Sequence, residues 1–203
     1  KWNNFKLQKD WVLLGDSAAI GECVFSKDNI ASKIEDYNDQ LNIINLGNSG
    51  LGPLMKLAIL KEYAEIIKPK KIIWIYIEDN DLIDIESEKN VNFLKNYLDI
   101  NHSEKLFLIQ KEIDEKITNI VKPEIDDEKY KKNIDYSLIT EKFELKKFLK
   151  FKKIRGRFDK STKYDLSNDL RYINNKEILI ETWKSAVKLA DTWSGQIYFV
   201  YFP

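Results

Sequence analysis

Four short runs of apolar residues stand out along the chain, and each is nearly continuous in aliphatic and aromatic side chains. A continuous run, in contrast to an alternating one, indicates a strand that is covered on both faces, as in a parallel sheet. The predicted strands are Trp11–Leu14, Ile43–Leu46, Ile72–Ile77 and Ile197–Phe202. The pattern therefore predicts a sheet of at least four buried strands.

Helical spacing of apolar residues fills the segments between these runs. It predicts helices over Ile30–Tyr37, over Leu54–Ile67 and over Asn174–Leu189. Gly52-Pro53 is typical of a helix start, and Ser194-Gly195 is typical of a helix end before the last strand. Alternation of strands and helices predicts an open α/β sheet with right-handed crossovers.

The stretch at about 103–165 departs from this alternation. It is longer than one crossover needs, and it predicts a helical insertion or cap within a single domain that spans 1–203. Phe107–Val121 has the spacing of an amphipathic helix that Lys122-Pro123 ends, and Ser137–Ile154 has that of a second helix. Since the chain opens close to one strand and closes directly after another, we expect further segments, including a C-terminal part of the domain.

Composition narrows the class of partner. The chain of 203 residues is 43% hydrophobic, and its 33 basic residues balance its 33 acidic ones, so no overall charge favours nucleic acid. A single cysteine excludes an internal disulfide. No apolar run has the length of a membrane span and no signal-peptide pattern is present, which leaves cytoplasm and cell envelope both open.

One basic segment, 142–163, has ten Lys or Arg residues against two acids, with phenylalanines between them. It could be an arm that contacts an anionic membrane, glycan or nucleic acid. The interpretation that we favour is a solvated helix whose aromatic side chains pack on the α/β core. Membrane contact through 142–163 is therefore not favoured, and nucleic acid is not an expected partner.

Candidate chemistry lies directly after the first three strands. Gly15-Asp16-Ser17 follows the first, Gly47–Gly52 the second, and Glu78–Asp81 the third, each as a predicted polar loop. In open α/β sheets, ligands bind beyond the carboxyl ends of the strands. A serine at a tight turn, a glycine N–H and an asparagine amide are the parts of a nucleophile with an oxyanion hole.

These three blocks, in this order, resemble those of the SGNH hydrolases, the GDSL esterases and lipases. The matching residues are Gly15-Asp16-Ser17, Asn45-Leu46-Gly47-Asn48-Ser49-Gly50 and Asn80-Asp81, within about Trp11 to Asp84. The resemblance implies a three-layer α/β/α, flavodoxin-like sheet with a helical insertion. It also implies that Ser17 is the nucleophile and that the N–H groups of Ser17 and Gly50 and the side chain of Asn80 hold the oxyanion.

The same resemblance implies an ester substrate, either a small molecule or a glycan, and no metal or organic cofactor. Water as the acceptor makes the protein an esterase, and a sugar hydroxyl makes it an O-acyltransferase; hydrolysis is the interpretation that we favour. Two alternatives stay open from the residues: a degenerate, non-catalytic SGNH-like binding domain, and a phosphate binder that uses Gly47–Gly52 as an anion nest.

The chain departs from the family pattern at several positions. Ala18 replaces a leucine, and Glu78 replaces the glycine of the third block. The family's catalytic Asp-x-x-His block comes after a later strand, and the 203 residues contain no such block in that place. Asp99 and His102 have the right spacing, but they lie too early in the chain, so they are only a weak candidate for the base.

Several of these residues also have purely structural interpretations. Ser17 could be a helix N-cap, and Asn80 a turn residue at a strand end. Asp16 is expected to bind local backbone amides, and Asp81 and Asp84 to form a solvated or loop-fixing pair. Cys23 is expected to be a small buried residue.

Overall fold

The computed structural model describes residues 11–38, 40–126 and 170–202. The chain divides into two compact units, one made of Lys1–Phe107 with Ser167–Pro203 and the other of Leu108–Leu166. The second unit overlaps the insertion predicted at about 103–165. The first unit contains the sheet and all the candidate site residues.

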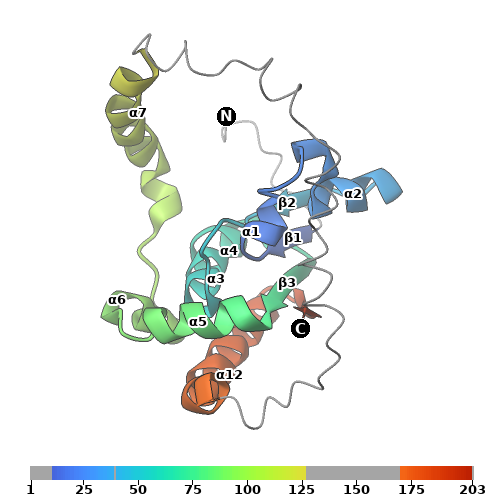
Figure 1. The fold of residues 1–203 in the computed structure, drawn as a ribbon, viewed down its shortest axis with the longest axis vertical. Helices are drawn as coiled ribbons and strands as arrows, with labels where there is room; N and C mark the ends of the chain where they lie inside the picture. The colour runs from blue at the N-terminus through green and yellow to red at the C-terminus, as the bar shows by residue number, and fades with distance from the viewer. Residues whose placement is uncertain (1–10, 39, 127–169, 203) are drawn as a thin grey trace, which may run out of the picture. The chain divides into compact units, whose positions relative to one another are not determined.

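The sheet has four parallel strands in the order β2-β1-β3-β4 (Figure 1). They are β1 (Trp11–Leu14), β2 (Ile43–Asn45), β3 (Lys71–Ile77) and β4 (Gln196–Phe202). Trp11 is in register with Ile43 of β2 and with Lys71 of β3, and Lys71 with Gln196 of β4. The predicted strands and the α/β class with a parallel sheet are confirmed.

The helices of the first unit fall between these strands, and the spacing predicts those over Ile30–Tyr37, Leu54–Ile67 and Asn174–Leu189. They are α1 (Ser17–Ile20), α2 (Ile30–Tyr37), α3 (Pro53–Ile59), α4 (Glu65–Ile67), α5 (Glu78–Glu88), α6 (Asn92–Lys95) and α12 (Leu170–Asp191). The helix predicted over Leu54–Ile67 is confirmed as α3 and α4, joined by the π-helical turn Leu60–Ala64. The last predicted helix is confirmed as α12, which extends beyond both predicted ends.

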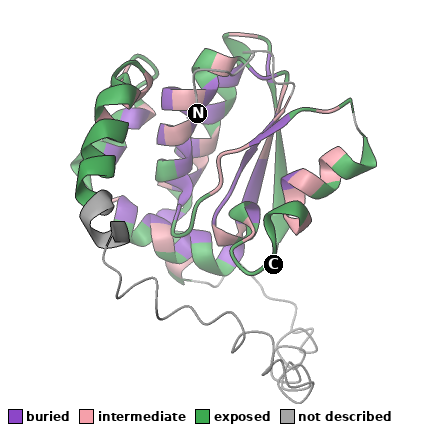
Figure 2. Cartoon of the chain, turned by 90° about the horizontal axis from the view of Figure 1, so that it is seen from above, coloured by how far each residue is buried: buried purple, intermediate pink, exposed green. Residues whose placement is uncertain are grey.

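Helices cover both faces of the sheet around β1 and β3. On one face, Leu13 and Ile75 pack in a buried cluster with Ala19 of α1 and Ala31 of α2. The other face contacts α12, where the ring of Tyr76 lies edge-on to Trp183 at 5.2 Å between centroids. Figure 2 shows buried residues concentrated in the strands and on the helix surfaces that face them. This double coverage explains why the strand sequences are continuous in apolar residues.

β4 is less covered than its sequence predicts. Its residues Tyr198–Phe202 are each 38–52% exposed, and within the described residues β4 pairs only with β3. Phe199 contacts Trp183 of α12 at 5.3 Å between ring centroids, so α12 covers part of one face. The prediction of burial on both faces is therefore wrong for this strand in the described structure.

The segment after β3 also differs from its prediction. It is not a loop, because α5 begins at Glu78, directly after the strand. Three acids, Glu78, Asp79 and Asp81, lie in the first turn of α5, where the helix dipole stabilises negative charge. Asn80 therefore lies in a helical turn, whose backbone is more constrained than that of a loop.

In the second unit, α7 (Gln110–Asp126) confirms the predicted amphipathic helix but not its end. The helix continues through Lys122-Pro123: the fixed φ of proline is compatible with a helix, although proline removes one backbone hydrogen bond. The helix predicted over Ser137–Ile154 and the basic segment 142–163 lie outside the described residues. No helix in the described ranges is both long enough and apolar enough to cross a membrane.

Candidate functional site

The turn between β1 and α1 positions Ser17. Asp16 is the N-cap of α1, and its Oδ1 accepts a hydrogen bond from the Ala18 N–H at 3.0 Å. Ser17 is the first helical residue and is half-buried. The structural alternative that made Ser17 the N-cap is therefore wrong, whereas the predicted role of Asp16 in binding a local amide is confirmed.

Two glycines bring the first and second blocks into close contact. A Cβ on Gly15 or on Gly47 would lie 2.6 Å from the Cβ of Ala19, so both positions require glycine for α1 to pack there. The Asn48 N–H donates to the Gly15 carbonyl at 3.2 Å, and the Asn45 side chain donates to the Ala19 carbonyl at 2.6 Å. The loop after β2 is thus fixed directly against the turn that carries Ser17.

Gly50 lies at the exposed tip of that loop. Its φ of +73° is in the left-handed region, which glycine adopts without strain. Within the described residues, neither the Gly50 N–H nor the Ser17 N–H has a hydrogen-bond partner. The neighbouring Ser49 hydroxyl donates to Glu22 Oε2 at 2.9 Å, which links this loop to the residues just after α1.

The third block meets the first through a side-chain hydrogen bond. Asn80 Nδ2 donates to Asp16 Oδ2 at 2.9 Å. Because an ionised carboxylate only accepts hydrogen bonds, Asp16 fixes which end of the Asn80 amide faces it. The nitrogen carries two N–H groups, so a second one stays available to a ligand. The contact joins the carboxyl ends of β1 and β3, where the strand order reverses and where open α/β sheets bind ligands.

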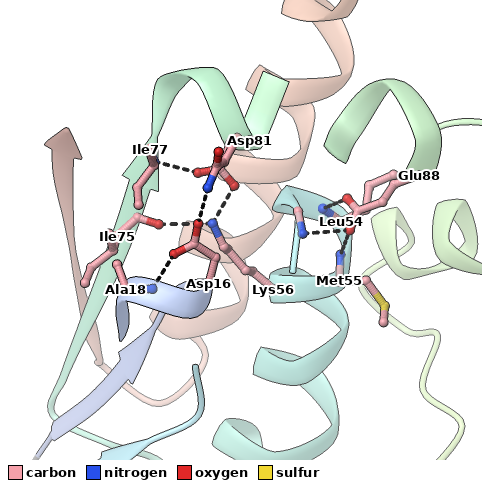
Figure 3. A network of polar contacts seen from close by, with 11 residues as sticks. Asp16, Ala18, Leu54, Met55, Lys56, Ile75, Ile77, Asp81 and Glu88 are labelled. Carbon is pink, nitrogen blue, oxygen red and sulfur yellow. Dashed lines mark hydrogen bonds and ion pairs between the residues drawn. The ribbon is translucent and has the colours of Figure 1, made fainter. Parts of the chain in front are cut away.

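The residue that follows Asn80, Asp81, forms a buried ion pair with Lys56 (Figure 3). Lys56 of α3 is fully buried, and its ammonium group contacts Asp81 Oδ1 and donates to the Ile75 carbonyl at 3.1 Å. Asp81 Oδ2 accepts from the Ile77 N–H at 2.7 Å, at the end of β3. Burial raises the pKa of Asp81 to about 6, and the charge of Lys56 opposes that shift.

This ion pair was not predicted from the sequence. Asp81 is buried, so its prediction as a solvated residue is wrong, whereas its contact with the Ile77 amide agrees with the loop-fixing alternative. Burial also raises the pKa of Asp84. A signal was present, because Lys56 falls three residues after Pro53 and four before Leu60, on a helix face that is otherwise apolar.

Glu88, at the end of α5, holds the start of α3. Its Oε1 accepts from the N–H groups of Gly52 at 3.0 Å and Met55 at 3.3 Å, and its Oε2 from that of Leu54 at 2.9 Å. A Cβ on Gly52 would lie 2.6 Å from this carboxylate, so glycine is needed there. Burial raises the pKa of Glu88 to about 7, against the opposing effect of the three amides.

We expect this raised pKa to make the stability of the fold depend on pH. The folded protein binds a proton at Glu88 at higher pH than the unfolded chain does, so the free energy of unfolding rises as the pH falls from about 8 to about 5. The shift from 4.5 to about 7 corresponds to at most about 3 kcal/mol. Urea unfolding at both pH values measures the change.

Glu88→Gln should remove this part of the pH dependence, and the exposed Glu65→Gln serves as the matched control. Because Glu88 is protonated at about pH 5 and a glutamine amide resembles a protonated carboxyl, with one acceptor end and one donor end, the variant should be about as stable as the parent protein at that pH. An equal pH dependence in the parent protein and in Glu88→Gln contradicts this account.

Glu78, which stands in the place of the family's glycine, points towards β4. It is 3% exposed, and its Oε2 accepts a hydrogen bond from the Tyr201 hydroxyl. This contact, together with burial, raises the pKa of Tyr201 to about 12. The Glu78 carboxylate therefore binds a side chain of β4. Within the described residues, none of its hydrogen bonds involves Ser17, Gly50 or Asn80.

Asp99 and His102 contact residues other than Ser17. The His102 ring lies edge-on to Tyr97 at 4.9 Å, and its Nε2 is 3.4 Å from a Glu104 carboxylate oxygen without hydrogen-bond geometry. Asp99 Oδ1 accepts from the Asn101 N–H at 3.0 Å. Within the described residues, no contact links either side chain to Ser17, so their role as the base stays a prediction.

Cys23 is exposed, so its prediction as a buried residue is wrong. The cause is local: α1 ends after one turn at Gly21, whose φ of +81° turns the chain towards the surface.

Neither the protein-family models nor the curated proteins compared with this chain give a match. No group of three His, Cys, Asp or Glu side chains within the described residues is arranged to hold a metal ion. What the structure brings together is a serine turn, a glycine loop and an asparagine amide, all at one end of the sheet.

Proposed function

We propose that this protein is a serine ester hydrolase of the SGNH type, built on a flavodoxin-like, three-layer α/β/α sheet. The strand order β2-β1-β3-β4 supports this fold, because flavodoxin-like sheets have the order 2-1-3-4-5. The substrate is an ester of a small molecule or a glycan.

The observation that carries the proposal is the hydrogen bond from Asn80 to Asp16. It connects the candidate oxyanion donor of the third block to the residue that precedes the candidate nucleophile. Three segments far apart in sequence thus meet at the strand switch point, since Asn48 of the second block also contacts Gly15. If the three short motifs matched the family pattern by chance, contacts between them would not be expected.

In the proposed reaction, Ser17 Oγ forms a bond to the ester carbonyl carbon while its proton passes to a base. The carbonyl oxygen becomes an oxyanion, and the Ser17 N–H, the Gly50 N–H and the free N–H of Asn80 donate to it. Collapse breaks the bond to the alcohol, which leaves with a proton from the base. Water then attacks the acyl-enzyme in the same way and releases the acid.

The identity of the base is proposed from the resemblance to SGNH hydrolases. In SGNH hydrolases it is the histidine of the Asp-x-x-His block after a later strand, and we propose the same for this protein. Experiments therefore use the protein as its gene encodes it. Transfer of the acyl group to a sugar in place of water would make the protein an O-acyltransferase, and binding of esters without turnover would make it a non-catalytic domain.

The proposal is tested by Asn80→Ala, assayed on a p-nitrophenyl ester. Loss of one oxyanion donor lowers kcat by about 10²–10³-fold, with little change in KM, because the donor acts mainly in the transition state. Because Asn80→Ala also removes the hydrogen bond to the buried Asp16, the variant should unfold somewhat below the parent temperature, and the assay is run well below both unfolding temperatures.

Asn90→Ala is the matched control, as Asn90 is an exposed asparagine just after the same helix. It should retain the parent kcat. A kcat for Asn80→Ala within about fivefold of the parent value would remove Asn80 from the oxyanion hole.

A further inference from the structure

A groove of about 380 Å³ opens beside Ser17. Its walls come from α1, from the turn after it and from the start of α2, and they include Ser17, Ala18, Glu22, Val24, Asp28 and Ile30. This volume lies in the range of small-molecule sites. Two other cavities, of about 340 and 360 Å³, lie along α12 and the start of β4, and no candidate site residue lines them.

The shape of the groove depends on Gly21. Its left-handed φ ends α1, and its N–H donates to the Ser17 carbonyl at 3.1 Å. A Cβ at this position would lie 2.6 Å from the Asn29 Cβ and 3.0 Å from a Val24 methyl group. The tight turn therefore brings Val24 and the start of α2 to the same groove that Ser17 lines.

Apolar and acidic groups share the lining. Val24 is 51% exposed, and with Ala18 and Ile30 it offers apolar surface that a bound chain would cover. Glu22 accepts from the Ser49 hydroxyl, whereas Asp28 lies 2.9 Å from the ammonium group of Lys33. The charge of Asp28 is thus balanced by a neighbouring cation, and that of Glu22 gives the groove a negative side.

We propose that this groove binds the acyl group of the ester that Ser17 attacks, and that it selects an uncharged chain of a few carbons over one that ends in a carboxylate. The proposal rests on the ester hydrolysis proposed above. The apolar wall favours methylene groups, and the Glu22 carboxylate repels a second carboxylate. At about 5 Å in solvent-exposed surroundings, such repulsion changes binding by about 5- to 15-fold.

A matched pair of substrates tests the charge selection: p-nitrophenyl hexanoate and the p-nitrophenyl monoester of adipic acid, whose chains have equal length. The parent protein should have a kcat/KM at least about fivefold higher for the hexanoate. Glu22→Gln should reduce this preference to about twofold or less, whereas the exposed Glu65→Gln should leave it unchanged.

A second variant tests the apolar wall. Val24→Trp fills the groove, and it should lower kcat/KM for the hexanoate by about tenfold or more, with a much smaller effect on the acetate. Val91→Trp, at an exposed valine that does not line the groove, is the control. Retained hydrolysis of the acetate shows that the Val24 variant is folded.

Cys23 gives a readout that needs no turnover, because it lines the groove and is the single cysteine of the 203 residues. Hexanamide, an uncleaved analogue, should slow alkylation of Cys23 by iodoacetamide about threefold or more, also in Ser17→Ala. Mass spectrometry of the Cys23 peptide measures the rate.

The outcomes separate the two proposals. Protection of Cys23 without any ester hydrolysis supports the groove as a binding site and overturns the proposed function. Ser17-dependent hydrolysis with no effect of Val24→Trp, no effect of Glu22→Gln and no protection of Cys23 overturns the groove and leaves the function standing.

Discussion

Ser17→Ala is expected to lower kcat/KM for ester hydrolysis by about 10³-fold or more. Removal of the nucleophile eliminates the acyl-enzyme route, and in serine hydrolases a loss of this kind reaches about 10⁶-fold in kcat. The remaining rate comes from the oxyanion donors acting on attack by water. Initial rates on p-nitrophenyl acetate at several enzyme concentrations measure the effect.

The control for this variant is Ser87→Ala, at an exposed serine of α5. It should hydrolyse the ester at the parent rate. Because Ser17 Oγ has no hydrogen-bond partner within the described residues, Ser17→Ala should also keep the parent unfolding temperature. Full activity in Ser17→Ala would exclude the proposed mechanism, including the roles of Gly50 and Asn80 in it.

The second large effect is expected at the buried ion pair. Asp81→Asn leaves the fully buried Lys56 ammonium group without its carboxylate, and loss of one partner from such a pair costs about 3–5 kcal/mol of unfolding free energy. For a protein of this size, that lowers the unfolding temperature by about 6–20 °C. Urea unfolding and thermal melts at about pH 8 measure both quantities.

Lys56→Met gives the complementary result. At about pH 8 it leaves an ionised, buried Asp81, whereas at about pH 5 the carboxyl can take a proton, so the destabilisation should be smaller at the lower pH. The double variant Lys56→Met/Asp81→Asn should recover part of the loss, because it leaves no buried charge of the pair.

Asp79→Asn, at an exposed acid paired with Arg171, is the control and should change stability little. Equal small effects for Asp79→Asn and Asp81→Asn would show that the ion pair does not stabilise the fold.

The sequence predicts the strands and the main helices well because burial in a parallel sheet and helical spacing both leave a pattern in apolar residues. β1 and α2 have the predicted bounds, and β2 and β3 differ by one residue. The pattern of apolar residues gave wrong predictions where contacts other than apolar packing determine the structure. α5 begins without a loop because three acids favour its first turn, and α7 passes through Pro123, which no periodicity of apolar residues reveals.

The candidate site was predictable in its parts but not in its connections. Motif order indicated Ser17, Gly50 and Asn80, but the contact of Asn80 with Asp16 depends on which strands are neighbours in the sheet. Buried charged residues were missed for a similar reason. Glu62, for example, accepts hydrogen bonds from Tyr97, Ser103 and the backbone of Leu106, residues that are far from it in sequence.

If Ser17 carries the acyl group during turnover, the acyl-enzyme can be trapped on its side chain. The protein is mixed with p-nitrophenyl acetate and quenched in acid within the first turnover, and its peptides are then weighed by mass spectrometry. We expect a burst of about one p-nitrophenolate per chain and one acetyl group on the peptide that contains Ser17. Continued hydrolysis with the acetyl group on another residue, or with no burst and no acetyl group on Ser17, would exclude Ser17 as the residue that carries the acyl group.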